Sequence, residues 1–353
     1  MASLIVMYDV SIIMPVYNCE KWLEESLYSI LKQKFVGSLQ LCIFNDASTD
    51  NSTSIIKLFI PLFTKRGISV KLINSKRKTP GGCGYAKNEA IKYSEGKYLC
   101  FFDADDIMNP ERISKQFNEA LRSNPFTLIG CQVKRIPKNS TLRYTKWLNK
   151  LTEEQLSLQV FTANGPTIAM PTWFCSKSLF DSVEGGFCED GKGCPEDYLF
   201  FLKLFEKHCN FTRINYPLVV YRHHLGCTSS SVKKETIWNI RIKAIEKHIL
   251  RKWSSFTIWN AGKQGRKFYR SLSFSFKNRV IAFCDVDIKK IKKGFYTYQL
   301  SENKIKPTIP VLHFSEALKP FVICMKQDLT NGAFENNLQS LNLREGIDYV
   351  MFS

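Results

Sequence analysis

Three carboxylates within four positions follow an apolar run in the first third of the chain. The run Tyr98–Phe102 has strand character, and Asp103, Asp105 and Asp106 come directly after it. Such a strand lies inside a sheet, and open α/β sheets bind ligands at the carboxyl ends of their strands. Clustered carboxylates repel one another unless a cation lies between them, and oxygen atoms suit hard divalent ions. The pattern indicates a site for a metal ion and a nucleotide diphosphate.

A second interpretation of the same stretch is a strand that runs into a helix-capping loop. Asn109-Pro110-Glu111 is typical of a helix start, and an acidic residue before such a start caps helices without binding a metal. Deciding between the two interpretations requires the surrounding segments.

The surrounding segments predict a sheet that would position these carboxylates. The expected strands lie at 10–18, 39–44, 69–74 and 98–102, with helices at 20–33, from about 52, and at 85–93. This alternation is the pattern of a doubly wound parallel sheet. Its ligand-facing loops would bring residues 15–18, 46–50, 81–87 and 103–106 into one crevice.

Length and composition predict two folded parts. Of the 353 residues, 44% are hydrophobic and 23% charged, and no apolar run approaches the ~20 residues of a membrane span. We expect a large α/β domain over 1–230, a basic helical linker over 231–254, and a small Rossmann-like α/β domain over 255–353. The twelve cysteines are scattered without paired CxxC motifs, and no convincing signal peptide begins the chain. Both features favour a cytoplasmic location without a membrane partner.

Positive charge is concentrated in the last third. Lysine and arginine number 50 against 32 acidic residues, a net charge of +18; residues 231–353 hold 22 basic and 10 acidic residues, which is +12. Aromatic residues such as Trp238, Trp253 and Tyr269 lie among these basic residues, which would suit a structured RNA. The alternative is a solvated lysine-rich surface over an aromatic core. Ala261–Gly265, with Asp285 about 20 residues on, resembles a degenerate dinucleotide fingerprint, and we expect a recognition domain there.

Six spaced motifs occur in a fixed order. They are Pro15–Asn18, Asn45–Asp50, Gly84–Asn88, Phe102–Asp106, Glu196-Asp197 and Tyr221–His224. Over residues 8–230 this order resembles glycosyltransferase family 2, in which a GT-A fold with a mostly parallel central sheet binds a nucleotide-sugar donor. The resemblance implies a metal-dependent enzyme.

The resemblance also implies roles for single residues. Those expected to contact the UDP-sugar donor are Asp46 at the uracil, Pro15 and Tyr17 beside it, Gly84 and Lys87 near the diphosphate, and Asp103 at the ribose or diphosphate. Lys87 stands where the family commonly has arginine, so the bidentate contact with phosphate is lost. Asp105 and His224 would bind Mn²⁺ or Mg²⁺, with His223 as an alternative ligand.

Asp197 would be the general base that deprotonates the acceptor hydroxyl. A single base opposite the leaving group implies direct displacement with inversion at the anomeric carbon. Two alternatives stay open at this point: Asp197 could cap its helix while Glu196 acts as base, and Asp46 could be a turn residue.

The whole chain resembles the β-1,3-N-acetylglucosaminyltransferase-like group of queuosine-tRNA galactosyltransferases. This likeness implies that galactose is transferred from UDP-galactose to queuosine in a tRNA anticodon, with tRNA-Tyr suggested. One alternative is a UDP-GlcNAc or UDP-glucose transferase acting on a glycan or protein. Another is a non-catalytic RNA-binding protein on a transferase scaffold. The sequence indicates no protein partner.

Overall fold

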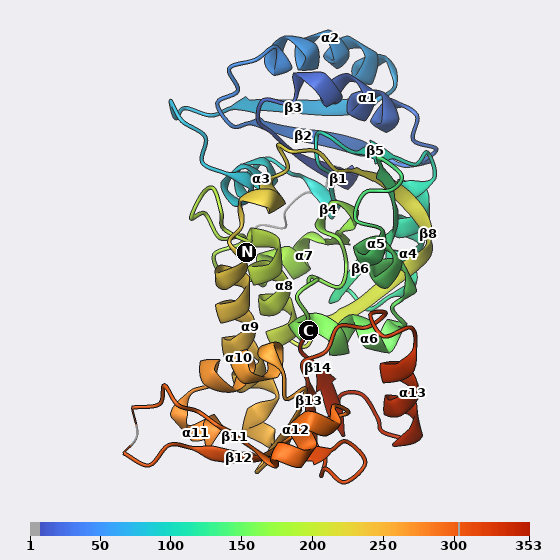
Figure 1. Ribbon diagram of the computed structural model, residues 1–353. Helices are drawn as coiled ribbons and strands as arrows, with labels where there is room; N and C mark the ends of the chain where they lie inside the picture. Colours follow the sequence, from blue (N-terminus) through green and yellow to red (C-terminus); the bar gives the residue numbers. More distant parts are fainter. Residues whose placement is uncertain (1–7, 303) are drawn as a thin grey trace. The chain divides into compact units, whose positions relative to one another are not determined.

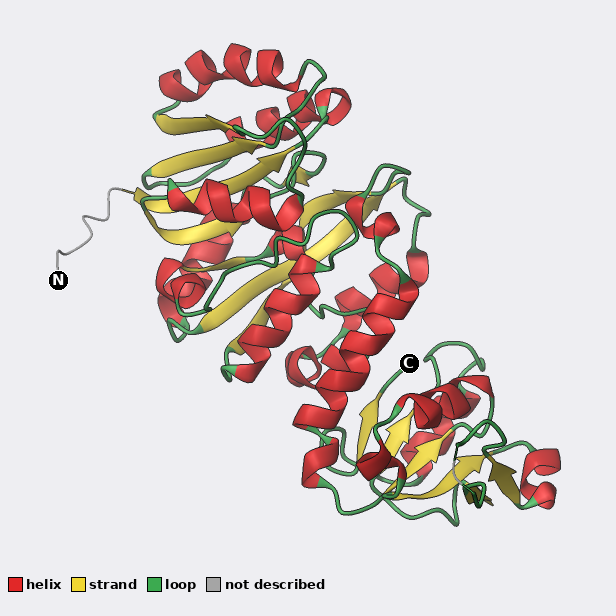
Figure 2. Cartoon of the chain, turned by 90° about the vertical axis from the view of Figure 1, so that its left-hand side faces the viewer, coloured by secondary structure: helices red, strands yellow, loops and turns green. Residues whose placement is uncertain are grey.

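The computed structural model describes residues 8–302 and 304–353, which form two compact units (Figure 1). The N-terminal unit contains the described residues up to Ser157 together with Pro166–Lys233. The C-terminal unit contains Leu158–Gly165 and Lys234–Ser353. A short segment from the middle of the chain therefore folds with the last third. Figure 2 shows the helices of each unit against the faces of its sheet.

The N-terminal unit is organised around an eight-stranded sheet with the strand order β3-β2-β1-β4-β7-β6-β8-β5. Its strands are β1 (Tyr8–Val16), β2 (Leu39–Asn45), β3 (Ile68–Asn74), β4 (Gly96–Phe101), β5 (Ile107–Met108), β6 (Thr127–Ile136), β7 (Phe174–Ser176) and β8 (Asn210–Arg222). The first four in spatial order run parallel, as do β6 and β8, whereas β7 and β5 run antiparallel to their neighbours. The predicted mostly parallel α/β sheet is confirmed.

Helices connect the strands of this unit. They are α1 (Glu20–Leu31), α2 (Ser52–Lys65), α3 (Cys83–Lys92), α4 (Arg112–Arg122), α5 (Leu142–Lys150), α6 (Glu153–Leu158), α7 (Lys177–Asp181) and α8 (Glu196–Glu206), with 3-10 turns η2 (Met170–Thr172) and η3 (Thr228–Ser231). Each of the first three helices follows a parallel strand and precedes the next, which is the expected crossover pattern.

Burial explains why β1 and β4 lie centrally. Val10 pairs with Leu39 on one side and with Tyr98 on the other, so β1 has neighbours on both edges. All residues of β2 are buried, and in β4 only Lys97 is exposed. Strands buried on both faces read as continuous apolar runs, and the polar residues that follow them lie at the carboxyl edge of the sheet.

The C-terminal unit has its own six-stranded sheet with the order β11-β12-β10-β9-β13-β14. Its elements are η1 (Gln159–Phe161), α9 (Lys234–His248), η4 (Leu250–Lys252), β9 (Phe256–Trp259), α10 (Lys263–Ser271), α11 (Phe274–Lys277), β10 (Val280–Asp285), α12 (Ile288–Lys293), β11 (Phe295–Thr297), β12 (Thr308–His313), β13 (Phe321–Ile323), α13 (Ala333–Ser340) and β14 (Tyr349–Met351). All neighbours except β11 and β12 run parallel. Leaving out β11, the sheet has a Rossmann-like 3-2-1-4-5 order.

A separate core holds the C-terminal unit together. Trp259 stacks on Phe314 at 5.3 Å between ring centroids and meets Phe334 edge-on at 5.6 Å. The basic stretch expected as a linker contains α9, whose Trp238, Ile242 and Ile245 are buried. Among the described residues, no helix has the length and apolar character needed to cross a membrane.

Candidate active site

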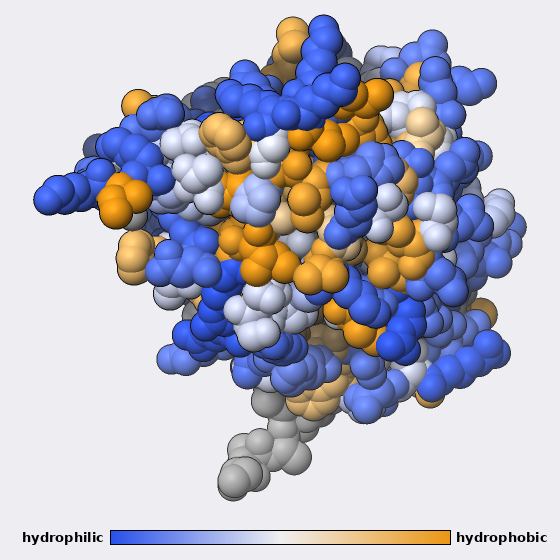
Figure 3. Space-filling view, turned by 60° about the horizontal axis from the view of Figure 1, so that its bottom comes forward, coloured by the Kyte–Doolittle hydropathy of each residue, from blue (hydrophilic) through white to orange (hydrophobic). Residues whose placement is uncertain are grey.

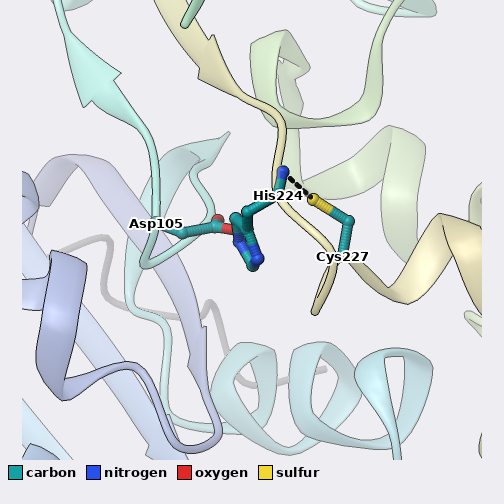
Figure 4. Close-up of side chains that lie close together, drawn as sticks. All are labelled: Asp105, His224 and Cys227. Carbon is teal, nitrogen blue, oxygen red and sulfur yellow. Dashed lines mark hydrogen bonds and ion pairs between the residues drawn. The ribbon is translucent and has the colours of Figure 1, made fainter. Parts of the chain in front are cut away.

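The carboxylate loop after β4 meets the loop after β8. Asp105 Oδ2 lies 2.8 Å from His224 Nε2, and both side chains are only partly exposed (Figure 4). The Trp22 ring, from α1, lies 5.6 Å from the His224 ring and covers it. His223 is exposed, and its backbone N–H donates to Ile136 O. Of the two neighbouring histidines, His224 is therefore the one that faces the carboxylates.

A backbone contact determines the tautomer of His224. The N–H of Gly226 donates to Nδ1 at 3.1 Å, so the neutral ring carries its hydrogen on Nε2 and directs it at Asp105. A cation bound by Nε2 would replace that hydrogen and require Nδ1 to become the donor. Metal binding at His224 therefore implies that the Gly226 contact opens.

Asp106 anchors the loop with one oxygen, whereas its Oδ2 is buried without a hydrogen-bond partner among the described residues. A carboxylate oxygen of Asp106 lies within 4.8 Å of ligand atoms of Asp103 and Asp105. The Oδ1 of Asp106 accepts the backbone N–H of Arg222 at 2.8 Å, and Arg222 Nε donates to the carbonyl of Asp105 at 2.8 Å. The Arg222 guanidinium also pairs with Glu25 and lies 4.4 Å from the centroid of the Trp22 ring. Because Arg222 is two residues before His224, these bonds position the histidine beside Asp105.

The arrangement fits a divalent cation by its donor set. Asp103 has a buried oxygen, Oδ1, without a hydrogen-bond partner within the described part of the chain. Two carboxylates and one imidazole are ligands that Mn²⁺ and Mg²⁺ accept. Asp105 and His224 would hold such an ion.

Cys227 extends this group, and sequence reasoning missed it. Its Sγ lies with the ligand atoms of Asp105 and His224 in a group whose members are all within 4.8 Å of one another. Its Sγ also accepts the backbone N–H of His224 at 3.3 Å (Figure 4). The one available signal was its spacing, three residues after the histidine. Cys188, Asp190 and Cys194 form another group that meets the same distance criterion.

A buried ion pair joins α3 to the start of α8. Lys87 Nζ lies 2.7 Å from Glu196 Oε1, and the two residues are 0% and 8% exposed. Burial would lower the pKa of Lys87, but the neighbouring Cys83, Glu196 and Asp103 outweigh it and raise that pKa. Lys87, expected near the diphosphate, thus has its ammonium group committed to a carboxylate that is 109 residues further along the chain.

The acidic side chains at this edge perturb one another. Burial raises the pKa of Asp103 to about 7, opposed by Lys87 and reinforced by Asp105, Glu196 and Asp197. Burial and the adjacent Glu196 raise the pKa of Asp197 to about 6, again opposed by Lys87. Asp197 Oδ1 accepts the N–H of Tyr198 at 2.7 Å. Residues from three motifs, far apart in sequence, therefore share one electrostatic environment.

Asp46 holds the glycine turn before α3. Its Oδ1 accepts the N–H of Gly81 at 2.9 Å and its Oδ2 that of Gly82 at 2.8 Å. The residue is 2% exposed, so both oxygens are already in use on the turn. Contact with a uracil would use the remaining lone pairs of this carboxylate. Pro15 lies in β1, and Tyr17, which follows it, is 47% exposed.

Gly84 is required by a close approach of the chain. A Cβ at this position would lie 2.0 Å from the carbonyl oxygen of Cys188 and 3.2 Å from Cβ of Glu196. The first turn of α3 therefore packs directly against the segment that leads into α8. Because Gly84 has no side chain, α3 approaches this segment closely enough for Lys87 to reach Glu196.

Comparison with known proteins identifies the family. The model of glycosyl transferase family 2 matches residues 11–183. Glycosyltransferase GlyG of Streptococcus pneumoniae serotype 4 is 30% identical over 229 residues, 62% of this chain and 71% of GlyG. The chain belongs to glycosyl transferase family 2. This membership confirms the prediction of a glycosyltransferase at the level of the family.

Two further comparisons concern length and fold. Hyaluronan synthase of Pasteurella multocida is 26% identical over 231 residues, 64% of this chain, yet the chain spans about a fifth of that synthase (21%). The crystal structure of Staphylococcus aureus TarS 1–349 in complex with UDP-GlcNAc superimposes with a TM-score of 0.53 at 20% identity, covering 77% of this chain and 72% of TarS 1–349. This superposition confirms the predicted GT-A fold.

Proposed function

We propose that this family 2 chain is a metal-dependent glycosyltransferase that moves a hexose from a UDP-sugar with inversion. The observation that carries the proposal is geometric: Asp105 Oδ2 lies 2.8 Å from His224 Nε2, and Asp103, two residues earlier, has a buried oxygen without a hydrogen-bond partner among the described residues. Burial and nearby carboxylates also raise the pKa of Asp103 and of Asp197. Perturbed carboxylates at the carboxyl edge of a parallel sheet are typical of catalytic sites. TarS 1–349, which shares the fold, was crystallised in complex with UDP-GlcNAc, and this is consistent with a UDP-sugar donor.

The charge at the site fits the departure of a diphosphate. A cation held by Asp105 and His224 would supply charge neutralisation to the leaving UDP. Asp103, whose Oδ1 is buried without a hydrogen-bond partner among the described residues, has a ligand atom within 4.8 Å of that of Asp105. Trp22 shields the His224 ring from solvent on one side, which strengthens electrostatic contacts there.

Asp197 is suited to take the proton of the acceptor. A base is effective when its pKa lies near the working pH, and the pKa of Asp197 is raised to about 6. Glu196 is buried and its carboxylate is engaged by Lys87, whereas Asp197 is partly exposed, which leaves Asp197 as the accessible carboxylate of the two. Attack by the deprotonated hydroxyl from the face opposite UDP inverts the anomeric carbon.

For the sugar and the acceptor, we propose UDP-galactose and queuosine-containing tRNA. The support is the whole-chain resemblance together with the net charge of +12 over residues 231–353, which suits a polyanionic acceptor. A UDP-GlcNAc or UDP-glucose transferase acting on a glycan is the second candidate, and the UDP-GlcNAc of the TarS complex favours it.

The test is a donor and acceptor screen. The purified protein, with Mn²⁺ or Mg²⁺, is incubated with UDP-galactose, UDP-GlcNAc or UDP-glucose and with tRNA that contains or lacks queuosine. Mass spectrometry of the nucleosides should detect a hexosylated queuosine only with UDP-galactose. Transfer to a glycan acceptor with UDP-GlcNAc instead would select the second candidate.

A variant separates catalysis from binding. Asp197→Asn should lower kcat by about 10²–10⁴-fold and leave the Kd for UDP unchanged, because only proton transfer is lost. The matched control is Asp181→Asn, an exposed carboxylate on α7 paired with Lys177. Equal activity of both variants would rule out Asp197 as the base.

A further inference from the structure

A hollow on the C-terminal unit has the lining of a ligand site. It encloses about 370 Å³ between α10, the end of α12 and strand β11. Its lining includes the basic residues Arg266, Arg270 and Lys293. Its volume lies within the ~300–1,000 Å³ of small-molecule sites. We call this hollow the α10–β11 pocket.

The charge of the α10–β11 pocket is uncompensated. Within the described part of the chain, Arg266, Arg270 and Lys293 form no ion pair, and none of the lining residues carries a carboxylate. The nearby acids Asp285 and Asp287 are both bound by Lys290. Three cations around one concave surface create a positive potential that an anion would relieve.

Three aromatic residues, Phe295, Tyr296 and Tyr298, also line the pocket. The Arg266 guanidinium lies 5.0 Å from the centroid of the Tyr296 ring, and Arg270 Nη1 lies 3.4 Å from the Tyr296 hydroxyl. Tyr269 meets Tyr296 edge-on at 6.2 Å, so Tyr296 is held in place. Phe295, in contrast, is 49% exposed. Figure 3 shows that apolar residues are grouped among hydrophilic ones on the face it displays.

The combination of cationic side chains with an exposed aromatic ring favours some anions over others. A bare phosphate would be bound by the cations alone and would make no use of the exposed Phe295 ring. A nucleotide supplies both a phosphate for charged side chains and a flat base for stacking on an aromatic ring. An acidic peptide would supply charge without a base.

We propose that the α10–β11 pocket binds a nucleotide, with its phosphate between Arg270 and Lys293 and its base against Phe295. The nucleotide is part of a single-stranded RNA segment or a free nucleotide. The choice of RNA rests on the proposed function, in which an RNA is the acceptor, whereas the nucleotide chemistry rests on the pocket alone.

The experiment measures fluorescence anisotropy of a fluorescein-labelled, unmodified 12-nucleotide single-stranded RNA with the full-length protein. Arg270→Gln and Lys293→Gln should each weaken binding and lower the slope of log K against log salt by about one, because each contacts a phosphate. Phe295→Leu should weaken binding about fivefold or more with an unchanged slope, since only stacking is lost. Arg266 is left intact because its Nε donates to the carbonyl of Ala261.

Lys292→Gln is the matched control. Lys292 is exposed on α12, adjacent to Lys293 but outside the lining. If Lys292→Gln and Lys293→Gln weaken binding equally, or if poly-glutamate displaces the RNA as well as unlabelled RNA does, the pocket is a general basic surface and the proposal is wrong. Displacement by AMP or UMP at millimolar concentration, lost in Phe295→Leu, supports a nucleotide site and identifies the free nucleotide as a source.

The donor reaction provides an independent readout. UDP-sugar hydrolysis in the absence of acceptor should be the same in all pocket variants. If the protein hydrolyses UDP-sugar but the pocket variants bind RNA and nucleotides as the wild type does, the nucleotide-site proposal is wrong and the proposed function stands. If the pocket variants lose binding but the wild type neither hydrolyses UDP-sugar nor transfers the sugar, the nucleotide site stands and the proposed function is wrong.

Discussion

Both sheets place a carboxylate at the end of a parallel strand, but the two carboxylates have different surroundings. Asp103, after β4, has a buried oxygen without a hydrogen-bond partner among the described residues. Asp285, at the end of β10, uses both oxygens: Oδ1 accepts from Val286 and Asp287, and Oδ2 from Ala261 and Lys290. Position at a strand end therefore does not make a ligand site. A carboxylate is available to a ligand when the residues around it leave one of its oxygens without a hydrogen-bond partner.

The same comparison explains the glycine motifs. In the C-terminal unit, a Cβ on Gly265 would lie 1.8 Å from the carbonyl oxygen of Asn260, so the glycine permits α10 to pack on β9. The acid of this fingerprint-like stretch binds the backbone of Ala261 rather than remaining free for a ribose. The glycine of this dinucleotide-like pattern thus serves helix–strand packing, and three cations without an ion pair to any described residue line the α10–β11 pocket of the same unit.

The largest expected effect comes from breaking the buried ion pair of the N-terminal unit. Lys87→Met would leave Glu196 buried without its partner, and we expect a loss of about 3–5 kcal/mol in the free energy of unfolding. Urea denaturation monitored by circular dichroism measures it. The double variant Lys87→Met with Glu196→Leu should recover much of this loss. No recovery would mean that Lys87 acts through other contacts.

Next in size is the loss of a proposed metal ligand. Asp105→Asn should reduce sugar transfer by about 10²–10³-fold, as expected when charge stabilisation of the transition state is removed. Thermal stability should change little, because the side chain is partly exposed and its one described side-chain contact, to His224, can be kept by the amide oxygen. Binding of Mn²⁺, followed by electron paramagnetic resonance, should weaken in parallel. Unchanged Mn²⁺ affinity would contradict the assignment.

Asp285→Asn is the counterpart in the C-terminal unit. Replacing one acceptor oxygen by an amide leaves a backbone N–H or Lys290 without its partner, and we expect a loss of about 1–3 kcal/mol in stability. UDP-sugar hydrolysis at a temperature where the protein is folded should not change. A fall in hydrolysis comparable to that of Asp105→Asn would remove the distinction between the two carboxylates.

The smallest effect concerns pH. Because the pKa of Asp197 is raised to about 6, its basic form predominates above that pH and is lost below it. We expect kcat/KM to be level above about pH 7 and to fall about tenfold for each pH unit well below 6. Glu196→Gln removes the neighbouring charge that helps to raise this pKa, so the profile should shift to lower pH. A shift to higher pH would contradict this electrostatic account.

Much of the fold was predictable from local pattern. Apolar runs such as Leu39–Phe44 and Tyr98–Phe102 can satisfy their faces only inside a sheet, and the alternation with helices implies parallel strands. The first four strands were predicted to within about two residues at each end, and the GT-A class was implied by the family resemblance that the six motifs carry. The long strands β6 and β8 were not predicted. The antiparallel strand β7 and the membership of Leu158–Gly165 in the C-terminal unit depend on long-range packing, for which the sequence carries no periodic signal.

The residue types and their order determined which side chains reach the carboxyl edge of the sheet. Only the tertiary structure decided which of them have partners. Asp106 meets the backbone of Arg222 across 116 positions, Asp46 binds a turn 35 residues away, and Lys87 pairs with Glu196 across 109. The physical reason is that hydrogen bonding and burial depend on neighbours in space. A carboxylate can therefore be identified from sequence, whereas its freedom to bind a ligand depends on the folded chain around it.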